Sequence, residues 1–231
     1  MAADSLNPPQ REAIRYLDGP LLVLAGAGSG KTRVITQKIA WLTGEGGIAP
    51  DKITAITFTN KAAKEMKERA ARLIGGRGEG LAISTFHSLG ARILRQEARH
   101  IGLKPGFSIL DASDTGQLFQ EMLKNADKAR IRGVQNRISL WKNAVVGPGE
   151  AANIAVNDLE AGAAKVYAEY ERTLRAYQAV DFDDLIRLPV ELFESHDDVA
   201  SRWRSRIWHL LVDEYQDTNR CQYRLMKLLT G

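Results

Sequence analysis

The sequence has a single cysteine and no long hydrophobic run, and these two absences exclude several classes of protein. Cys221, the one cysteine in 231 residues, can form neither an internal disulfide nor a cysteine-built zinc site, which suits a reducing cytosol. The longest apolar run, Leu21 to Ala25, is far shorter than the ~20 residues that span a bilayer. No charged-then-apolar leader opens the chain. We therefore expect a cytoplasmic protein with no membrane partner.

The sequence also lacks a large excess of positive or negative charge. The chain has 32 Lys and Arg against 28 Asp and Glu, a net charge of +4, which permits a nucleic-acid partner without establishing one. Hydrophobic residues at 44% and charged residues at 26% are ordinary for a folded protein and exclude a disordered chain.

Strand-like and helix-like stretches alternate along the chain, which predicts an α/β fold with a parallel sheet. Short apolar strands are predicted at 20–25, 53–58, 81–85 and 208–213. Helices are predicted at 31–42, 61–74 and 86–99, the second of them capped by Asn60.

The middle of the chain, about 113–178, has a helical period and no convincing strand. Two apolar helix faces, from Ile131 to Val145 and from Leu159 to Tyr177, are separated by Gly147-Pro148-Gly149. Trp141 and Tyr170 occupy positions on these faces, where we expect them to pack in the core. The simplest architecture is a sheet domain interrupted by a helical insertion at about 89–180.

A glycine-rich loop follows the first predicted strand and opens a helix, which is the context of a phosphate-binding loop. Backbone N–H groups of such a loop bind phosphate oxygens, and the helix N-terminus adds partial positive charge. Lys31 is the candidate for the β- and γ-phosphates, and the Thr32 hydroxyl is a candidate Mg²⁺ ligand. The loop consists of Ala25, Gly26, Ala27, Gly28, Ser29, Gly30, Lys31 and Thr32, with Ala25 where the strict pattern has glycine.

A second candidate site is the acidic pair at the end of the last predicted strand. Asp213 and Glu214 follow Leu210-Leu-Val212, so we expect them at the carboxyl edge of the sheet, where ligands bind in open α/β folds. We predict that Asp213 holds Mg²⁺ and that Glu214 orients and deprotonates an attacking water. The pair favours nucleotide hydrolysis over phosphoryl transfer to a small molecule.

Six ordered segments resemble motifs of the superfamily 1A DNA helicases, the UvrD-like group that includes Rep, UvrD and PcrA. Asp213-Glu-Tyr-Gln-Asp-Thr-Asn219 is similar to the acidic motif of this family, and the short matches are most similar to Rep. The other five segments are Leu6-Asn-Pro-Pro-Gln10, Ala25 to Arg33, Ile56 to Met66, Ser84-Thr-Phe-His-Ser88 and Asp181-Phe-Asp-Asp-Leu185.

The resemblance implies a RecA-like P-loop domain, called 1A, with an inserted all-helical subdomain, called 1B. In this sequence 1A corresponds to 1–88 and an incomplete 181–231, and 1B corresponds to 89–180. The resemblance further implies that this chain is an N-terminal fragment that lacks the second RecA-like domain and its arginine fingers. The implied parent is an ATP-dependent, Mg²⁺-dependent helicase that tracks 3′ to 5′ along single-stranded DNA, acts on forks and partial duplexes, and works with replication or repair proteins at the bacterial nucleoid.

The resemblance also assigns roles residue by residue. Gln10 is implied to read the adenine edge, Arg33 to lie against base or ribose, and Gln216 to couple water position to DNA. The expected DNA contacts, which follow two predicted strands, are Thr57, Phe58, Asn60, Thr85, Phe86 and His87, and the segment 61–99 carries nine Lys or Arg against four Asp or Glu. Basic residues of the insertion are either duplex contacts or a solvated helix face; they are Arg130, Arg132, Arg137 and Lys142.

Three functions stay open from the sequence. The first is a DNA helicase whose isolated N-terminal piece turns over little ATP, since an arginine finger is worth ~10³–10⁵ in rate. The second is a nucleotide- and DNA-binding module without hydrolysis. The third is the motor part of a helicase–nuclease subunit.

Overall fold

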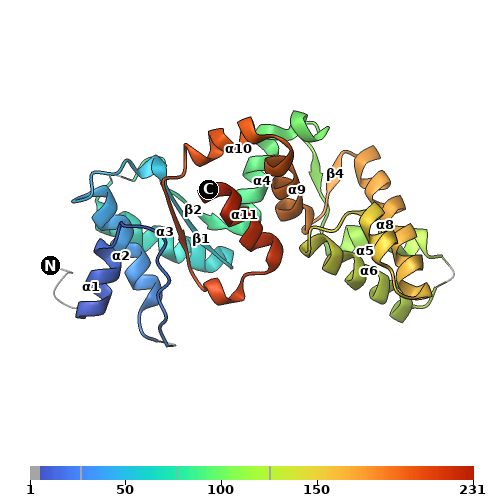
Figure 1. Cartoon of the computed structure of the whole chain (residues 1–231), viewed down its shortest axis with the longest axis horizontal. Helices are drawn as coiled ribbons and strands as arrows, with labels where there is room; N and C mark the ends of the chain where they lie inside the picture. The colour runs from blue at the N-terminus through green and yellow to red at the C-terminus, as the bar shows by residue number, and fades with distance from the viewer. Residues whose placement is uncertain (1–5, 27, 77, 125) are drawn as a thin grey trace. The chain divides into compact units, whose positions relative to one another are not determined.

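The structure, a computed structural model, describes residues 6–26, 28–76, 78–124 and 126–231, and the chain divides into two compact units (Figure 1). The first unit consists of Met1–Phe86, Trp203–Asp217 and Thr230. The second consists of His87–Arg202, Thr218–Leu229 and Gly231. The chain therefore leaves the first unit after Phe86 and returns to it at Trp203.

The first unit contains a parallel sheet of three strands in the order β2-β1-β5. The strands are β1 (Ile53–Thr57), β2 (Ala82–Thr85) and β5 (His209–Val212). All five residues of the central strand are buried, as expected for an apolar strand covered on both faces. Thr57 pairs with Thr85, and Ile56 pairs with Val212, so the three strands end at the same edge of the sheet. The predicted parallel sheet is confirmed.

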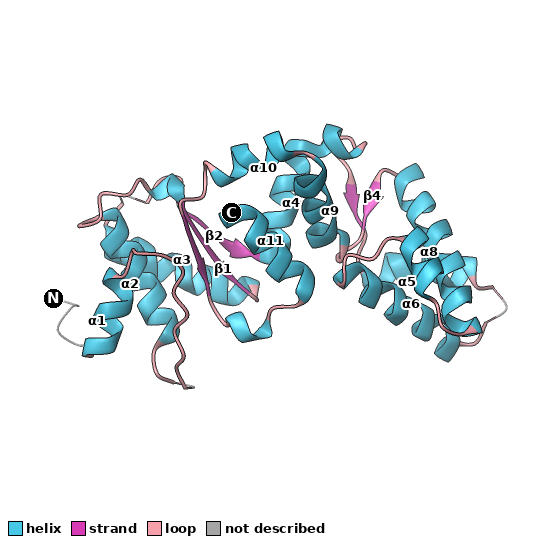
Figure 2. Ribbon diagram, in the orientation of Figure 1, coloured by secondary structure: helices cyan, strands magenta, loops and turns pink. Residues whose placement is uncertain are grey.

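The helices of this unit are α1 (Pro8–Arg15), α2 (Lys31–Thr43) and α3 (Asn60–Ile74), with short 3₁₀ turns at η2 (Pro50–Lys52) and η4 (Tyr215–Asp217) (Figure 2). Apolar side chains of α2 and α3 pack on the sheet, and α1 packs on α2. Ile39 from α2 and Met66 from α3 join Ile53 in one buried cluster. The cap of α3 differs from the prediction: Thr59 is the N-cap, because its side chain accepts a hydrogen bond from Ala62 N, and Asn60 is the first helical residue.

The strand predicted at 20–25 is wrong. Leu21 to Leu24 have no strand partner, and their side chains are exposed, up to 87% at Leu24. An apolar run indicates that a segment can be buried, but a strand exists only where a neighbour takes up its backbone hydrogen bonds. None of the described strands in this unit pairs with Leu21 to Leu24.

The second unit is mostly helical. It contains α4 (Phe86–Glu97), η3 (Ala98–Ile101), α5 (Ala112–Met122), α6 (Lys128–Asn143), α7 (Pro148–Ile154), α8 (Asp158–Ala176), α9 (Asp184–Ser195), α10 (Asp197–Arg204) and α11 (Arg220–Thr230), where one or two terminal residues of α4, α10 and α11 belong to the first unit. The helical character of 113–178 is confirmed. The glycine-proline stretch does more than separate two helices, because Gly147 is the N-cap of the short α7.

A parallel pair of two-residue strands, β3 (Ser108–Ile109) and β4 (Ala179–Val180), was not predicted. It brings the residues before α5 beside the residues after α8. The segment 89–180 is therefore not entirely helical. Two-residue strands are too short for a periodic sequence signal.

The helical core of the second unit is built from aromatic and aliphatic side chains of α5, α6 and α8. Trp141 stacks on Tyr167 at 6.1 Å between ring centroids, and Phe119 lies 4.5 Å from Tyr170. The expected packing roles of Trp141 and Tyr170 are confirmed, with 5% and 1% exposure. Leu159, however, is exposed, so the apolar face of α8 is narrower than predicted.

Helix α4 packs closely on α9 at Gly90. A Cβ added to Gly90 would lie 1.7 Å from the carbonyl oxygen of Leu185, which no side chain tolerates. Glycine is therefore required there by close backbone approach. Within the described ranges, no helix combines the length and the apolar character needed to cross a membrane.

Candidate nucleotide site and DNA-contact residues

The phosphate loop turns through glycines into the first turn of α2. Gly28 and Gly30 have φ values of 74° and 87°, and Gly30 is the N-cap of α2. Ser29 closes the turn, because its hydroxyl donates to the carbonyl oxygen of Gly26 at 2.7 Å. No side chain caps α2, so its first N–H groups are directed to an anion or solvent. Ala27, predicted to belong to this loop, lies outside the described residues.

The fold brings the loop and the acidic pair together, although they are about 180 residues apart in sequence. Lys31 Nζ lies 3.1 Å from Glu214 Oε2, and Thr32 Oγ1 donates to Asp213 Oδ2 at 3.2 Å. Asp213 is held at the sheet edge, because its backbone N–H donates to Ile56 O at 2.9 Å. The two halves of the predicted site are therefore adjacent.

Asp213 has the properties of a metal ligand. The residue is 4% exposed, and its second carboxylate oxygen, Oδ1, has no hydrogen-bond partner among the described residues. Burial raises the pKa of Asp213, and the charge of Glu214 adds to this, while the Thr32 hydroxyl acts in the opposite direction. Asp213 and Thr32 are the residues that would hold a divalent cation here, and such a cation would satisfy the orphaned oxygen and offset the cost of a buried charge.

Glu214 accepts hydrogen bonds from two side chains and has an unusual backbone conformation. Gln216 Nε2 donates to its Oε2 at 2.7 Å; this bond and the one from Lys31 lower the pKa of Glu214. Its φ is 50°, a region that costs a non-glycine residue free energy. Such strain is found where a side chain must point in one particular direction. Gln216 is thus placed beside the predicted catalytic carboxylate.

Gln10 links α1 to the phosphate loop. Asn7 and Gln10 form a reciprocal capping box, and Gln10 Nε2 donates to the carbonyl oxygen of Ser29 at 3.0 Å. The glutamine expected to read adenine therefore lies directly beside the loop. Arg33 is half-buried on the first turn of α2.

The residues predicted to contact DNA at the ends of β1 and β2 divide by exposure. Thr57, Thr85 and Phe86 are 2%, 6% and 1% exposed, so the structure places them in the core. Phe86 packs edge-on against Phe58 at 5.6 Å, and its ring supports Phe58 rather than facing solvent. Phe58 is half-buried and Asn60 exposed.

The second unit adds an aromatic pair that the sequence did not single out. His87, a predicted DNA contact, is half-buried, and its ring lies 4.6 Å from Phe182, which is 57% exposed. Burial lowers the pKa of His87, and the charge of Asp183 opposes this effect. The sequence signal for this pair was Phe182, an aromatic residue among the carboxylates of 181–184. Neither a buried helix nor a solvated turn requires an aromatic side chain at such a position.

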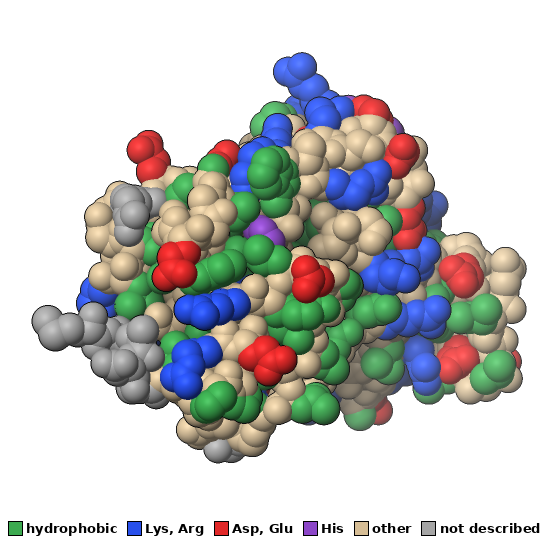
Figure 3. All heavy atoms as spheres, turned by 60° about the vertical axis from the view of Figure 1, so that its left-hand side comes forward, with side chains coloured by type: hydrophobic (Ala, Val, Ile, Leu, Met, Phe, Trp, Pro, Cys, Tyr) green, Lys and Arg blue, Asp and Glu red, His purple; other side chains and the backbone are tan. Residues whose placement is uncertain are grey.

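The basic residues of α6 do not form one surface. Lys142 is fully buried and pairs with Asp181, Asp184 and Glu171 at 2.7 to 2.9 Å, so its suggested contact with duplex DNA is wrong. Arg137 remains half-exposed and pairs with Glu160 at 3.0 Å. On the face seen in Figure 3, Lys and Arg side chains are interspersed with Asp and Glu, so charge alone does not mark a path for DNA there.

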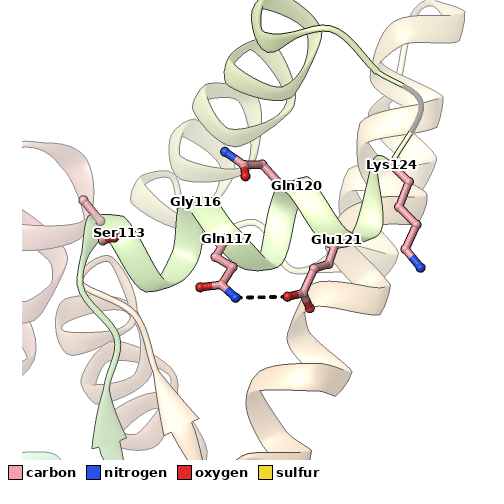
Figure 4. A pocket seen from close by; sticks show the side chains of 7 residues that line it. Ser113, Gly116, Gln117, Gln120, Glu121 and Lys124 are labelled. Atoms are coloured by element: carbon pink, nitrogen blue, oxygen red, sulfur yellow. Dashed lines mark hydrogen bonds between the residues drawn. The ribbon is translucent and has the colours of Figure 1, made fainter.

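A shallow hollow of about 750 Å³ lies on α5 (Figure 4). Small residues and flexible polar side chains line it, and Gln117 Nε2 donates to Glu121 Oε1 at 3.2 Å along one side of the helix. None of the predicted site residues lines this hollow. It is therefore unrelated to the nucleotide chemistry of the phosphate loop.

Comparison with known proteins agrees with this geometry. A family model described as UvrD/REP helicase N-terminal domain matches residues 6–231. The chain belongs to this family. Two similar UvrD/REP relatives are the ATP-dependent DNA helicase Rep of Escherichia coli (strain K12), 46% identical over 230 residues, and the ATP-dependent DNA helicase PcrA of Staphylococcus aureus (strain Mu50), 44% identical over 230 residues.

Each alignment covers 98% of this chain, but only 34% of Rep and 32% of PcrA. The chain thus spans about a third of the length of the curated relatives it matches. The predicted resemblance to the UvrD-like group is confirmed.

Proposed function

We propose that this chain is the N-terminal motor piece of an ATP-dependent DNA helicase that moves 3′ to 5′ along single-stranded DNA. One observation carries the proposal: Lys31 and Thr32 of the phosphate loop face Glu214 and Asp213. The orphaned Asp213 Oδ1 supports a metal-bound nucleotide at this place. The names of the relatives, which are ATP-dependent DNA helicases, support the substrate class.

In this proposal each residue has a defined task. Lys31 releases Glu214 and takes up the β- and γ-phosphates, so that Glu214 becomes available to accept a proton from water. Thr32 and Asp213 hold Mg²⁺, which neutralises phosphate charge when bound. Gln216 fixes the direction of the Glu214 carboxylate, and Gln10 faces the base. Phe58, Asn60, His87 and Phe182 are the proposed DNA contacts.

We assign 1–88 and 181–231 to the RecA-like domain 1A and 89–180 to the helical insertion 1B. The parent protein is proposed to act on forks and partial duplexes in the bacterial cytoplasm, together with replication or repair proteins. The chain alone binds nucleotide and single-stranded DNA but turns over little ATP, because the arginines that stabilise the transition state belong to a second RecA-like domain.

The first test is nucleotide binding and turnover by this 231-residue chain. A fluorescent ATP analogue with Mg²⁺ gives the Kd, and phosphate release with and without a thymidine oligonucleotide gives the rate. Lys31→Ala is expected to weaken nucleotide binding by about tenfold or more, since a charge-assisted hydrogen bond contributes ~1.5–3 kcal/mol. Lys64→Ala, an exposed lysine on α3, is the control and should leave the Kd unchanged.

Two results would contradict different parts of the proposal. Failure to bind nucleotide would remove the motor assignment. Rapid DNA-stimulated turnover that disappears in Lys31→Ala would keep the motor assignment but show that the missing arginines are not required.

A further inference from the structure

The side-chain amide of Asn143, the last residue of α6, makes hydrogen bonds in two directions. Its Nδ2 donates to Asp183 Oδ1 at 2.8 Å and to Ser139 O at 2.9 Å, and its Oδ1 accepts from Asn219 Nδ2 at 2.7 Å. A reversed amide would direct its oxygen at the Asp183 carboxylate and its NH₂ at the NH₂ of Asn219. Only one orientation satisfies all partners, so Asn143 acts as a polar connector.

Asn219 continues this connection into the segment after the acidic motif. It is the N-cap of α11: its Oδ1 accepts from Gln222 N at 2.8 Å, and its N–H donates to Gln222 Oε1 at 3.0 Å. Its Nδ2, which capping does not use, is the group that contacts Asn143. In sequence Asn219 follows Glu214 by only five residues, so its position restrains the chain that leaves the catalytic carboxylate.

On the other side of Asn143, Asp183 leads to the aromatic pair. It directly follows the exposed Phe182, whose ring contacts His87. The charge of Asp183 also acts on the His87 ring. The three side chains Asp183, Asn143 and Asn219 thus form a hydrogen-bonded path, which we call the amide bridge, from the chain neighbour of the proposed DNA contact Phe182 to the start of α11.

The end of α6 is a rigid support for this bridge. Lys142, the neighbour of Asn143, is fully buried against the carboxylates of Asp181 and Asp184. Two residues after Asn143, Val145 adopts a φ of 60°, which is strained for a β-branched residue. The consecutive residues Lys142 and Asn143 therefore engage three carboxylates of the 181–184 segment, so movement of that segment is transmitted to Asn143.

We propose that Asn143 is a positioning residue that couples DNA occupancy at His87 and Phe182 to the chain following the acidic motif, through the amide bridge. This inference rests on the proposed function. DNA bound at Phe182 fixes Asp183, Asp183 and Asn143 fix Asn219, and Asn219 restrains the segment that carries Glu214. Because binding linkage is reciprocal, nucleotide binding then strengthens or weakens DNA binding by the same factor.

The test is the ratio of nucleotide Kd values measured without and with a saturating thymidine oligonucleotide. The probe is a non-hydrolysable fluorescent ATP analogue with Mg²⁺, and the protein is the full 231-residue chain. In the wild type we expect a ratio that differs from 1 by about fivefold or more, the usual range of coupling. Asn219→Ser keeps an N-cap oxygen but removes the Nδ2 donor, and the ratio is expected to fall to about 1.

Asn143→Leu removes the bridge from the other side and should give the same ratio. Since both substitutions break one path, the double variant is expected to lose no more coupling than either single variant. Asn157→Ser, the same change at the N-cap of α8, is the matched control and keeps the wild-type ratio. Thermal unfolding of each variant separates loss of coupling from loss of structure, and Asn219→Ser is the decisive variant should Asn143→Leu fail to fold.

The outcomes distinguish this inference from the proposed function. If nucleotide and DNA both bind but the ratio is 1 in the wild type, or is unchanged in Asn219→Ser, the amide bridge does not couple the sites and the inference is overturned. If neither ligand binds, the proposed function fails and the inference fails with it.

Discussion

Lys31 and Lys142 are both paired with carboxylates, but they lie in opposite settings in the two units. Lys31 is 28% exposed and contacts one carboxylate, Glu214, which is itself 39% exposed. Lys142 is fully buried and contacts three carboxylates, two of which, Asp184 and Glu171, are shared with the buried Arg187. Burial lowers the pKa of Lys142, but the charges of Asp184, Asp181 and Glu171 outweigh burial and raise the pKa above its usual value.

This difference in burial separates an ion pair whose lysine can move to another partner from an ion pair whose lysine cannot. An exposed ion pair contributes little to stability, so Lys31 can leave Glu214 for a phosphate at little cost. A buried pair leaves an uncompensated charge when one partner is removed. Lys142 is therefore a structural residue, whereas Lys31 is available for ligand binding.

The largest expected effect is on stability at Lys142. Lys142→Met is expected to destabilise the folded chain by about 3–5 kcal/mol, because it removes the buried cation that pairs with Asp181 and leaves Asp184 and Glu171 with Arg187 alone. Urea denaturation followed by circular dichroism measures the change. Lys31→Met and the exposed Lys165→Met should each alter stability by less than about 1 kcal/mol. Equal losses at Lys31 and Lys142 would remove the distinction between the two lysines.

A smaller effect on stability is expected from substituting a glycine in each unit, Gly90 in α4 and Gly26 in the phosphate loop. Gly90→Ala should destabilise by about 1–3 kcal/mol, because the new methyl group overlaps Leu185 O. A Cβ at Gly26 in the phosphate loop meets no atom within 4 Å, so Gly26→Ala should leave the denaturation midpoint unchanged and weaken nucleotide binding instead. A stable Gly90→Ala variant would show that α4 and α9 can separate.

A third expected effect is a pH dependence at Asp181. Burial, reinforced by Asp184, raises the pKa of Asp181 to about 6, from 3.8, so the folded chain holds this proton more tightly than the unfolded chain. The contribution of Asp181 to stability therefore falls as pH rises from 3.8 to about 6. The stability difference between wild type and Asp181→Asn, measured by urea denaturation, should fall over this range.

Asp158→Asn, an exposed change on α8, is the control for this pH series and should not reproduce the slope. If the stability difference between wild type and Asp181→Asn rises with pH instead, Lys142 keeps Asp181 ionised over the whole pH range.

The sequence predicted the adjacency of the phosphate loop and the acidic pair better than it predicted their surroundings, for a physical reason. Gly30, Lys31 and Thr32 lie in one short loop, and Asp213 and Glu214 end one strand, so local pattern carries their chemistry. The parallel sheet then brings both segments to the same edge. These residues could be predicted because each requirement is met within a few positions of the chain.

Features that depend on contacts between distant segments could not be predicted in this way. The burial of Lys142 depends on carboxylates about 40 residues later in the chain. In the sequence of its helix, Lys142 cannot be distinguished from a solvent-exposed lysine. Phe86 and Phe58 follow two strands in the same way, yet only Phe58 is accessible. Leu21 to Leu24 have the composition of a buried strand, but composition does not supply a neighbouring strand to pair with.

The left-handed backbone of Glu214 has a consequence for engineering. Glycine, asparagine and aspartate adopt this conformation at lower cost than glutamate, so Glu214→Gly relieves strain. The same change removes the carboxylate proposed to activate water. A screen for thermostable variants of this chain would therefore enrich substitutions at this position that increase half-life while removing the proposed catalytic carboxylate, an example of a trade-off between stability and activity.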